Sequence, residues 1–266
     1  MALIPNIYLT AIKASIEASE VIMDIYKSGF KATIKKDGSP VTQADLAASK
    51  IIYNHLIKTE IPILGEELEK DDYFTRSKWT ENWCVDPLDG TRMFLMKNDE
   101  FSVNIAHIIG EKSVFGIIAS PTENKVIFGG KDTGVYTTSF KTIDKPESWN
   151  RIEPINTVNN PLTITCSRSF KKGPSYKHME QFEEAYEEIA YIRKGSALKF
   201  FDLAEGIADV YPRFAPTMEW DIAAGQAIVE ALGGEIIDIN SNKSLTYNKE
   251  DLYNPSFIVK MKAIIS

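Results

Sequence analysis

Hydrophobic residues near the start of the chain recur every three or four positions, which predicts a long helix that ends near Gly29. The residues of this face are Leu9, Ile12, Ile16, Met23 and Tyr26. The segment 31–41 is polar and contains glycine and proline, so we expect an exposed loop there. A second helix is predicted to start at Thr42 and to end before a short apolar strand at 61–64. This strand runs directly into Gly65-Glu66-Glu67.

The apolar positions then come in short runs, which predict a largely antiparallel sheet. Its expected strands lie at 83–85, 103–109, 113–118, 125–129 and 135–138. The stretch from about 141 to 161 has several prolines and no periodicity, so we expect it to join two halves, 1–145 and 160–266.

The second half alternates strands with helices, which indicates a second sheet layered with helices and an α+β fold. The expected strands lie at 162–166, 191–193, 208–211, 235–239 and 257–260, and the expected helices at 174–190, 196–205 and 221–232.

Composition and charge narrow the class of protein. The 266 residues are 44% hydrophobic and 25% charged, typical of a globular protein with a real core. The formal charge of −7 argues against a nucleic acid polymer as partner. Neither a secretion signal nor a transmembrane run is present, so we expect a cytoplasmic protein, with peripheral association at the inner membrane left open. Cys84 and Cys166 are too few for a disulfide framework, and we expect both to be buried in strands.

The segment Asp86-Pro87-Leu88-Asp89-Gly90-Thr91 directly follows a buried apolar strand. Because the proline favours a turn, both carboxylates can point at one spot, while Gly90 and Thr91 begin a turn or helix whose free N–H groups suit a phosphate. Carboxylates are the ligands that Mg²⁺ prefers, and two such ions can support phosphate-ester hydrolysis. The alternative is that Asp86 and Asp89 are turn residues and helix caps.

Two further carboxylates strengthen the magnesium hypothesis. Glu66 ends a short strand, and Asp221 begins a helix, although the first could be a solvated loop residue and the second an N-cap. Thr42 and Asp45 have the spacing of a reciprocal helix cap. A carboxylate such as Asp45 could also accept the proton of a bound water through the hydroxyl of Thr91. The residues therefore predict a magnesium-dependent hydrolase of phosphate monoesters.

Two long motifs resemble the lithium-sensitive, magnesium-dependent phosphatase superfamily of inositol monophosphatase, fructose-1,6-bisphosphatase and the 3′(2′),5′-bisphosphate nucleotidases. They are Trp83-Cys84-Val85-Asp86-Pro87-Leu88-Asp89-Gly90-Thr91 and Trp220-Asp221-Ile222-Ala223-Ala224-Gly225, which continues to Gly233-Gly234. The resemblance spans nearly the whole chain and implies a layered αβαβα sandwich with two or three Mg²⁺ ions and inhibition by lithium.

The resemblance also implies a role for each site residue. Glu66, Asp86 and the Leu88 carbonyl would bind one ion, and Asp86, Asp89 and Asp221 a second. Asp45 and Thr91 would activate the attacking water.

Within this superfamily the chain looks most like the bacterial 3′(2′),5′-bisphosphate nucleotidases. The similar segments are Lys35-Lys36-Asp37-Gly38-Ser39-Pro40-Val41-Thr42-Gln43-Ala44-Asp45, Gly195-Ser196-Ala197-Leu198-Lys199-Phe200 and Ala208-Asp209-Val210-Tyr211-Pro212-Arg213. They imply removal of the 3′-phosphate from adenosine 3′,5′-bisphosphate, a by-product of sulfate assimilation, to give AMP. A phosphorylated nucleotide is thus the expected small-molecule partner.

A second phosphate on the substrate calls for cations outside the metal centre. Lys199, Arg213 and Arg92 are the candidates, each of which could equally be a surface charge, and Gly90, Thr91 and Ser196 are further candidate substrate contacts. Tyr211 and Phe214 could stack on adenine, but packing in the core is the favoured interpretation.

One segment departs from the bacterial nucleotidase pattern. Those proteins usually continue the first motif as Gly-Thr-Lys-Glu-Phe, whereas this chain has Gly90-Thr91-Arg92-Met93-Phe94, a change beside the phosphate loop that bears on substrate preference. The alternatives left open are an inositol or sugar phosphatase of the same superfamily, and a catalytically silent metal-binding homologue. The sequence also leaves open the 5′-phosphosulfate analogue as a substrate and the oligomeric state.

Overall fold

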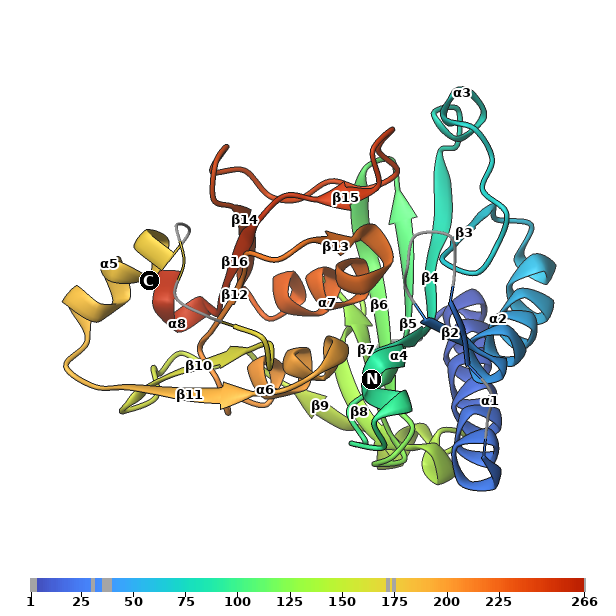
Figure 1. Ribbon diagram of the computed structural model, residues 1–266, viewed down its shortest axis with the longest axis horizontal. Coiled ribbons are helices and arrows are strands. Elements are labelled where there is room, and N and C mark those ends of the chain that lie inside the picture. Colours follow the sequence, from blue (N-terminus) through green and yellow to red (C-terminus); the bar gives the residue numbers. More distant parts are fainter. Residues whose placement is uncertain (1–3, 30–31, 35–39, 171–172, 174–175, 266) are drawn as a thin grey trace.

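The helices and strands stack in five layers in the order helix, sheet, helix, sheet, helix (Figure 1). The computed structural model describes residues 4–29, 32–34, 40–170, 173 and 176–265. This layering confirms the expected α+β class and the αβαβα sandwich. Within the described part of the chain, no helix is both long and apolar enough to span a membrane.

The first layer consists of two helices, α1 (Asn6–Ser28) and α2 (Gln43–Leu56), as their periodicity predicted. The buried face of α1 includes Ile12, Ile16 and Ile22, and the helix ends at Gly29, whose N–H donates to the carbonyl of Ile25. The N-terminus of α2 is capped by Thr42, whose hydroxyl accepts the N–H of Ala44 at 3.0 Å. Both helices cover the same face of the sheet beside them (Figure 1).

That sheet has seven strands in sequence order, with the first pair parallel and the others antiparallel. The strands are β3 (Ile63–Gly65), β4 (Glu81–Asp89), β5 (Ser102–Ile109), β6 (Lys112–Ser120), β7 (Lys125–Gly130), β8 (Gly134–Ser139) and β9 (Asn150–Ile152). The predicted antiparallel run is confirmed, and β4 is longer than expected because its pairing with β5 continues past a bulge between Asp86 and Asp89.

The second sheet has the order β11-β10-β12-β16-β14, with parallel pairs around β10 and antiparallel pairs around β16. The strands are β10 (Leu162–Cys166), β11 (Ile189–Arg193), β12 (Val210–Arg213), β14 (Glu235–Asp238) and β16 (Phe257–Lys260). Cys84 in β4 and Cys166 in β10 are free and buried, as expected.

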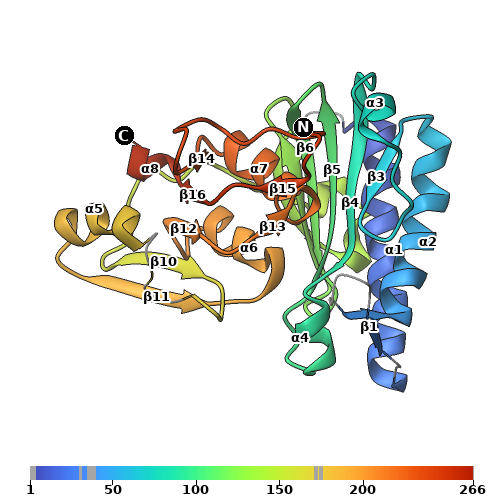
Figure 2. The ribbon, with the colours of Figure 1, turned by 45° about the horizontal axis from the view of Figure 1, so that its top comes forward.

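The middle layer is formed by α6 (Lys199–Ala204) and α7 (Glu219–Ala231), between the two sheets (Figures 1 and 2). Their approach to the first sheet is so close that a Cβ on Gly116 of β6 would lie 2.0 Å from the carbonyl oxygen of Ala224. A Cβ on Gly225 would likewise meet the ring of Phe200 at 2.2 Å. The small residues of α7 therefore let it fit between the sheets.

The outer layer consists of α5 (Lys177–Ala185) and α8 (Lys262–Ile265), which lie against the far face of the second sheet (Figure 1). The remaining short elements are the helices α3 (Tyr73–Arg76) and α4 (Thr91–Leu95), the 3₁₀ turns η1 (Ile57–Thr59), η2 (Phe140–Thr142), η3 (Pro146–Ser148) and η5 (Ser196–Leu198), and the strands β1 (Ala32–Ile34), β2 (Pro40–Thr42), β13 (Thr217–Met218) and β15 (Tyr253–Asn254).

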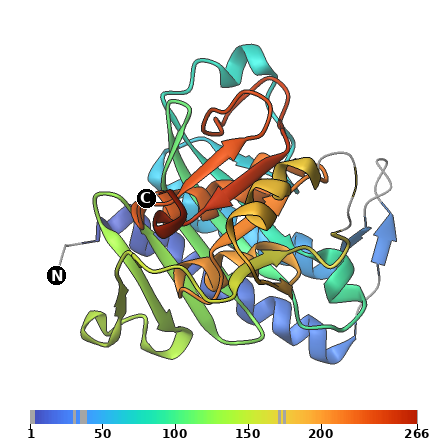
Figure 3. The ribbon, with the colours of Figure 1, turned by 90° about the vertical axis from the view of Figure 1, so that its left-hand side faces the viewer.

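Several local predictions were wrong. The expected loop at 31–41 contains the antiparallel pair β1–β2, which stands apart from the large sheets (Figure 3), while residues 35–39 lie outside the described chain. The expected connection at 141–161 contains β9, which pairs with β8, so the first sheet continues past residue 145. The expected helix at 174–190 is limited to α5 because the chain turns into β11, which pairs with β10.

Candidate metal centre and active site

Three aspartates meet where the two halves of the chain face each other. Asp86 and Asp89 lie at the end of β4, and Asp221 lies in the first turn of α7; each offers a carboxylate oxygen within 4.8 Å of the others. The turn at the end of β4 is held locally, since the N–H of Leu88 donates to the Asp86 carboxylate at 3.0 Å. The N–H of Met218 donates to the Asp221 carboxylate at 2.8 Å. Asp221 is therefore not the N-cap considered from the sequence, because α7 begins at Glu219 and its N-cap is Met218. Asp221 instead caps the helix from its third position, and this contact coexists with its place in the cluster.

The carboxylates repel one another inside the protein. Burial raises the pKa of Asp86 well above its usual range, and the charges of Glu66, Asp89 and Asp221 raise it further. Burial and the charge of Asp89 raise the pKa of Asp221 to about 8. The pKa of Asp89 is also raised by burial, against the opposing effect of Lys199. A divalent cation offsets both burial and repulsion, so this set of hard oxygen ligands fits one.

Glu66 and Leu88 lie beside this cluster. Glu66 directly follows β3, its N–H donates to the carbonyl of Val85 at 3.0 Å, and its side chain lines the same cavity. Its charge acts on Asp86, although Glu66 is not part of the group within 4.8 Å. The Leu88 carbonyl oxygen lies 3.2 Å from the Thr91 hydroxyl oxygen. All five residues expected to supply ligands thus line one cavity, and their role as ligands stays a prediction.

Asp45 and Thr91 are in direct contact. The Thr91 hydroxyl donates to one Asp45 oxygen at 3.0 Å, and the other oxygen accepts the N–H of Thr42 at 2.7 Å and its hydroxyl at 2.6 Å. Burial raises the pKa of Asp45, and these hydrogen bonds oppose the increase. The reciprocal cap of α2 and a carboxylate oriented toward Thr91 are therefore one arrangement, as the sequence left open.

The residues that follow Asp89 bring the two halves together. Gly90 has a φ of +92°, and a Cβ there would lie 2.8 Å from the carbonyl oxygen of Glu100, so this position requires glycine. Ser196 lines the cavity with a φ of +47°, and the N–H of Ala197 donates to the Asp89 carboxylate at 2.6 Å. The 3₁₀ turn η5 is thus tied to the end of β4.

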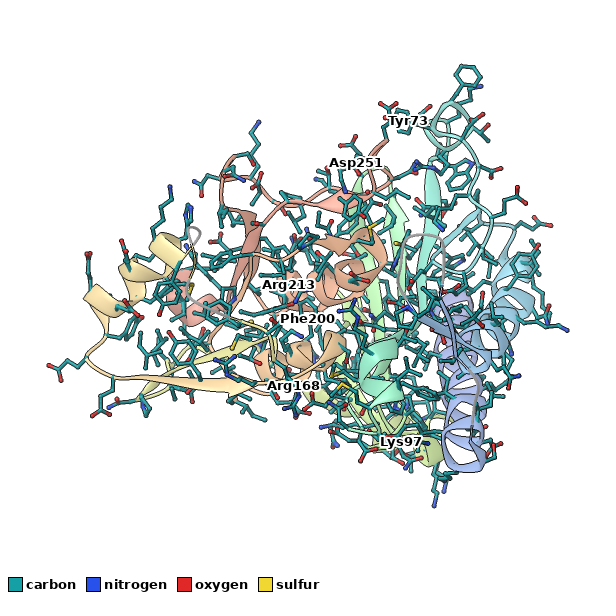
Figure 4. The ribbon with its side chains drawn as sticks, in the orientation of Figure 1. Tyr73, Lys97, Arg168, Phe200, Arg213 and Asp251 are labelled. Carbon is teal, nitrogen blue, oxygen red and sulfur yellow. The ribbon has the colours of Figure 1, made fainter. Side chains whose placement is uncertain are left out.

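The cations predicted to bind substrate, Lys199, Arg213 and Arg92, line a cavity of about 520 Å³. The three aspartates line the same cavity. Lys199 is buried, which lowers its pKa to about 8, and its ammonium donates to the carbonyls of Ser196 and Lys194. The surface-charge alternative is therefore wrong for Lys199. Arg213, which is labelled in Figure 4, donates to the carbonyl of Pro216 at 3.2 Å. Its buried Nε has no hydrogen-bond partner among the described residues. Arg92 is exposed at the rim.

The two aromatic candidates pack against protein. Tyr211 is buried with its ring edge-on to Phe200 and Phe257, at centroid distances of 5.7 and 5.8 Å. Phe214 packs against Phe170 at a centroid distance of 6.1 Å. Core packing, the favoured interpretation, is confirmed for both, although Tyr211 also lines the cavity.

The sequence interpretation missed two contacts at this site. Asn104 in β5 lies opposite Asp86, is buried, and donates to the Asp89 carboxylate at 3.4 Å. A lone amide between the apolar residues of a strand was the signal that could have found it. Glu100 accepts two hydrogen bonds from Arg168, at 2.6 and 2.5 Å, and one from the N–H of Gly195 at 2.8 Å. No local pattern indicated that second contact, because its members are distant in sequence.

Comparisons with known proteins bear on the family and the fold of the chain. A sequence model described as the inositol monophosphatase family matches residues 5–264. The 3′(2′),5′-bisphosphate nucleotidase CysQ of Escherichia coli K12 is 34% identical over 249 residues, which cover 92% of this chain and 95% of that protein. The crystal structure of CysQ from Bacteroides thetaiotaomicron, a bacterial member of the inositol monophosphatase family, aligns with a TM-score of 0.84 and 38% identity over 97% of both chains. The 2′AMP-bound SaIMPase-II structure aligns with a TM-score of 0.75 at 21% identity, over 98% of this chain and 91% of that chain, which shows the shared fold.

Proposed function

The chain belongs to the inositol monophosphatase family, and on that premise we propose that it hydrolyses the 3′-phosphate of adenosine 3′,5′-bisphosphate to AMP and inorganic phosphate. One observation carries the choice of substrate. The aspartate cluster shares its cavity with Lys199 and Arg213, so a molecule with one phosphate at the carboxylates can present a second to these cations. Relatives that align over 92% of the chain are named 3′(2′),5′-bisphosphate nucleotidases.

The family is metal-dependent, and Mg²⁺ is the ion we propose, with two or three per site and with lithium as an inhibitor. Glu66, Asp86, Asp89, Asp221 and the Leu88 carbonyl would hold it. When bound, it would neutralise charge on the phosphoryl group and promote ionisation of the attacking water. These oxygens are the hard ligands that Mg²⁺ prefers.

Asp45 and Thr91 would together accept the proton that the attacking water loses. The hydroxyl of Thr91 would accept this proton while its own passes to the Asp45 carboxylate, to which it already donates at 3.0 Å. Thr42 fixes the carboxylate through the opposite oxygen, and burial raises the pKa of Asp45, which makes it a better proton acceptor. The water oxygen would bond to phosphorus as the bond to the 3′-oxygen breaks, and the 3′-oxygen would take a proton from a solvent water. The proton held by Asp45 would then return to solvent.

Substrate contacts follow from the same cavity. Gly90 and Thr91 line the cavity and would contact the transferred phosphate, while Ser196, Lys199 and Arg213 line it where the second phosphate would bind. An inositol monophosphate carries one phosphate and neutral hydroxyls, so it would bring no second anion to the buried Lys199 or the partly buried Arg213. This argument favours the nucleotide over the inositol phosphatase alternative.

The location of the protein is a further part of the proposal. Both cysteines are free, as is usual for proteins of a reducing compartment, which supports the cytoplasm. Fractionation of cells followed by detection of the chain would test this. Recovery in a periplasmic or secreted fraction would contradict it.

The decisive assay measures phosphate release from adenosine 3′,5′-bisphosphate, inositol 1-phosphate and fructose 1,6-bisphosphate, with Mg²⁺ and with or without lithium. We expect the nucleotide to have the highest kcat/KM and the activity to require Mg²⁺ and to fall with lithium. Asp89→Asn should abolish activity, whereas Asp144→Asn, at an exposed carboxylate that pairs with Lys13, should leave it unchanged. A best substrate without a nucleotide, or full activity of Asp89→Asn, would overturn the proposal.

A further inference from the structure

A hydrogen-bonded clasp joins the β3–β4 connection to the C-terminal half, outside the cavity. Arg76, at the end of α3, is 4% exposed and donates to the Asn248 side-chain oxygen at 2.9 Å and the Lys249 carbonyl at 3.1 Å. The Asn248 amide donates in return to the Arg76 carbonyl at 2.8 Å. Tyr73 of α3 and Asp251, two residues after Lys249, lie at the same end of the molecule (Figure 4). Arg76 and Asn248 are thus joined by two reciprocal hydrogen bonds.

The same loop is tied to the first turn of α7. Glu219 is fully buried, and its carboxylate accepts the N–H of Asn248 at 2.7 Å, the N–H of Lys249 at 3.0 Å and the Lys249 ammonium at 2.5 Å. A buried carboxylate that loses such donors is costly, so these contacts hold the loop firmly to α7. Glu219 precedes Asp221 by two residues in the same helical turn.

The β3–β4 connection, which carries Arg76, also carries the expected metal ligand Glu66. The β3–β4 connection begins at Glu66, whose carbonyl accepts the ammonium of Lys70 at 2.9 Å. The same ammonium lies 4.9 Å from the ring centroid of Trp220, the residue before Asp221. The segment that carries Glu66 therefore contacts the first turn of α7 directly through Lys70. Through Arg76 it is joined to α7 indirectly, because the loop that Arg76 binds is itself bound by Glu219.

We propose that Asn248 is a positioning residue of the metal centre, which with Arg76 and Glu219 sets the place of Asp221 relative to Glu66. The inference rests on the proposed function, because it requires the carboxylate cluster to bind a metal. Glu66 and Asp221 come from different halves of the chain, and a metal site tolerates errors of only about 0.5 Å in its ligands. A tie between the two segments is therefore expected to affect metal affinity directly.

The position of Asn248 allows a clean substitution. Asn248 has a φ of +58°, which glycine adopts without strain, so Asn248→Gly removes both side-chain bonds to Arg76 but keeps the backbone N–H for Glu219. Asn242→Gly is the matched control, because Asn242 has a φ of +55° in an exposed turn. Both variants carry the same cost of added backbone freedom.

The experiment is a calorimetric titration of each chain with Mg²⁺ alone, followed by the Mg²⁺ dependence of phosphate release. We expect the Kd for Mg²⁺ to rise at least about threefold in Asn248→Gly and to be unchanged in Asn242→Gly. The effect should stay below the roughly 10–100-fold seen when direct partners of metal ligands are removed, since Asn248 acts through Glu219. At saturating Mg²⁺, kcat should return to the wild-type value.

A second variant keeps the hypothesis testable if the first one alters folding. A lysine at position 76 cannot reach all the acceptors of Arg76, so Arg76→Lys should weaken Mg²⁺ binding to a similar degree. The double variant should lose less Mg²⁺ affinity than the sum of the single losses, because both changes break the same link between Arg76 and Asn248. Equal Mg²⁺ affinity in wild type and both single variants, or additive losses, would overturn the proposal. Wild type that binds Mg²⁺ but hydrolyses no ester refutes only the proposed function, and wild type that binds no Mg²⁺ refutes both.

Discussion

Removing one charge from the aspartate cluster should stabilise the metal-free protein. Asp221→Asn keeps an oxygen that can accept the N–H of Met218, now at 2.8 Å, and removes the charge that is repelled by Asp89 and Glu66. We therefore expect the variant without Mg²⁺ to unfold at a higher denaturant concentration than the wild type, even though it is inactive.

The magnitude follows from the pKa of Asp221, which burial and Asp89 raise from 3.8 to about 8. Each pKa unit corresponds to about 1.4 kcal/mol, so the ionised carboxylate costs the folded state at most roughly 6 kcal/mol at pH 8 and above. Part of that cost is shared with its coupled neighbours, so we expect a gain of about 2 kcal/mol for the asparagine variant.

The pH dependence has a definite sign. Between pH 3.8 and 8 the folded state holds a proton on Asp221 that the unfolded state has released, so the wild type loses stability as the pH rises through this window. The variant lacks this contribution, and its advantage should grow up to pH 8 and then remain constant.

Urea unfolding of both chains, with a chelator or with Mg²⁺, measures these effects. The wild type should gain stability from Mg²⁺, and the variant should gain much less, because it has lost a ligand. A metal-free variant that is less stable than the metal-free wild type at pH 8 would refute the view that the aspartates repel one another in the folded state.

Three further predictions concern catalysis, recognition and packing. Thr91→Val should lower kcat by about 100-fold or more with little change in KM, since it removes the proton path to Asp45, as steady-state kinetics would show; an unchanged kcat would contradict the role of the hydroxyl. Lys199→Met should raise KM for adenosine 3′,5′-bisphosphate by about tenfold or more and leave KM for inositol 1-phosphate unchanged, and equal effects on both would argue against recognition of the second phosphate. Gly116→Ala should cost about 2–3 kcal/mol in urea unfolding, because its Cβ would meet the carbonyl oxygen of Ala224 at 2.0 Å; wild-type stability would refute this packing argument.

The parts of the fold that the sequence predicted are those with a local signal. The apolar stripe of α1, the cap formed by Thr42 and Asp45, and the antiparallel strands each depend on residues a few positions apart. The missed strands β9, β13 and β15 are two or three residues long and exist because a partner strand lies beside them. A pattern that short has no periodicity to detect.

The candidate site divides in the same way. The loop from Asp86 to Thr91 could be singled out from the sequence, because a buried strand ends there in two carboxylates, a proline and a glycine. That pattern alone also fits a structural turn, and only Glu66, Asp221, Asp45 and the family resemblance favoured a metal and phosphate site. Asp86 acts both as a turn residue and as a member of the carboxylate cluster. Its carboxylate accepts the N–H of Leu88, and it also lies close to the carboxylates of Asp89 and Asp221.

The tertiary structure alone decided which distant residues join that loop. Asp221 reaches it because α7 is narrow enough to lie between the two sheets, and the burial of Lys199 follows from the same layer. The contacts of Glu100 with Arg168, and of Arg76 with Asn248, also cross between segments far apart in the chain. Periodicity reports which face of an element is buried, but not which element will cover it. The chain by itself therefore determined the kind of chemistry, and the closure of two sheets around one helix layer determined the site.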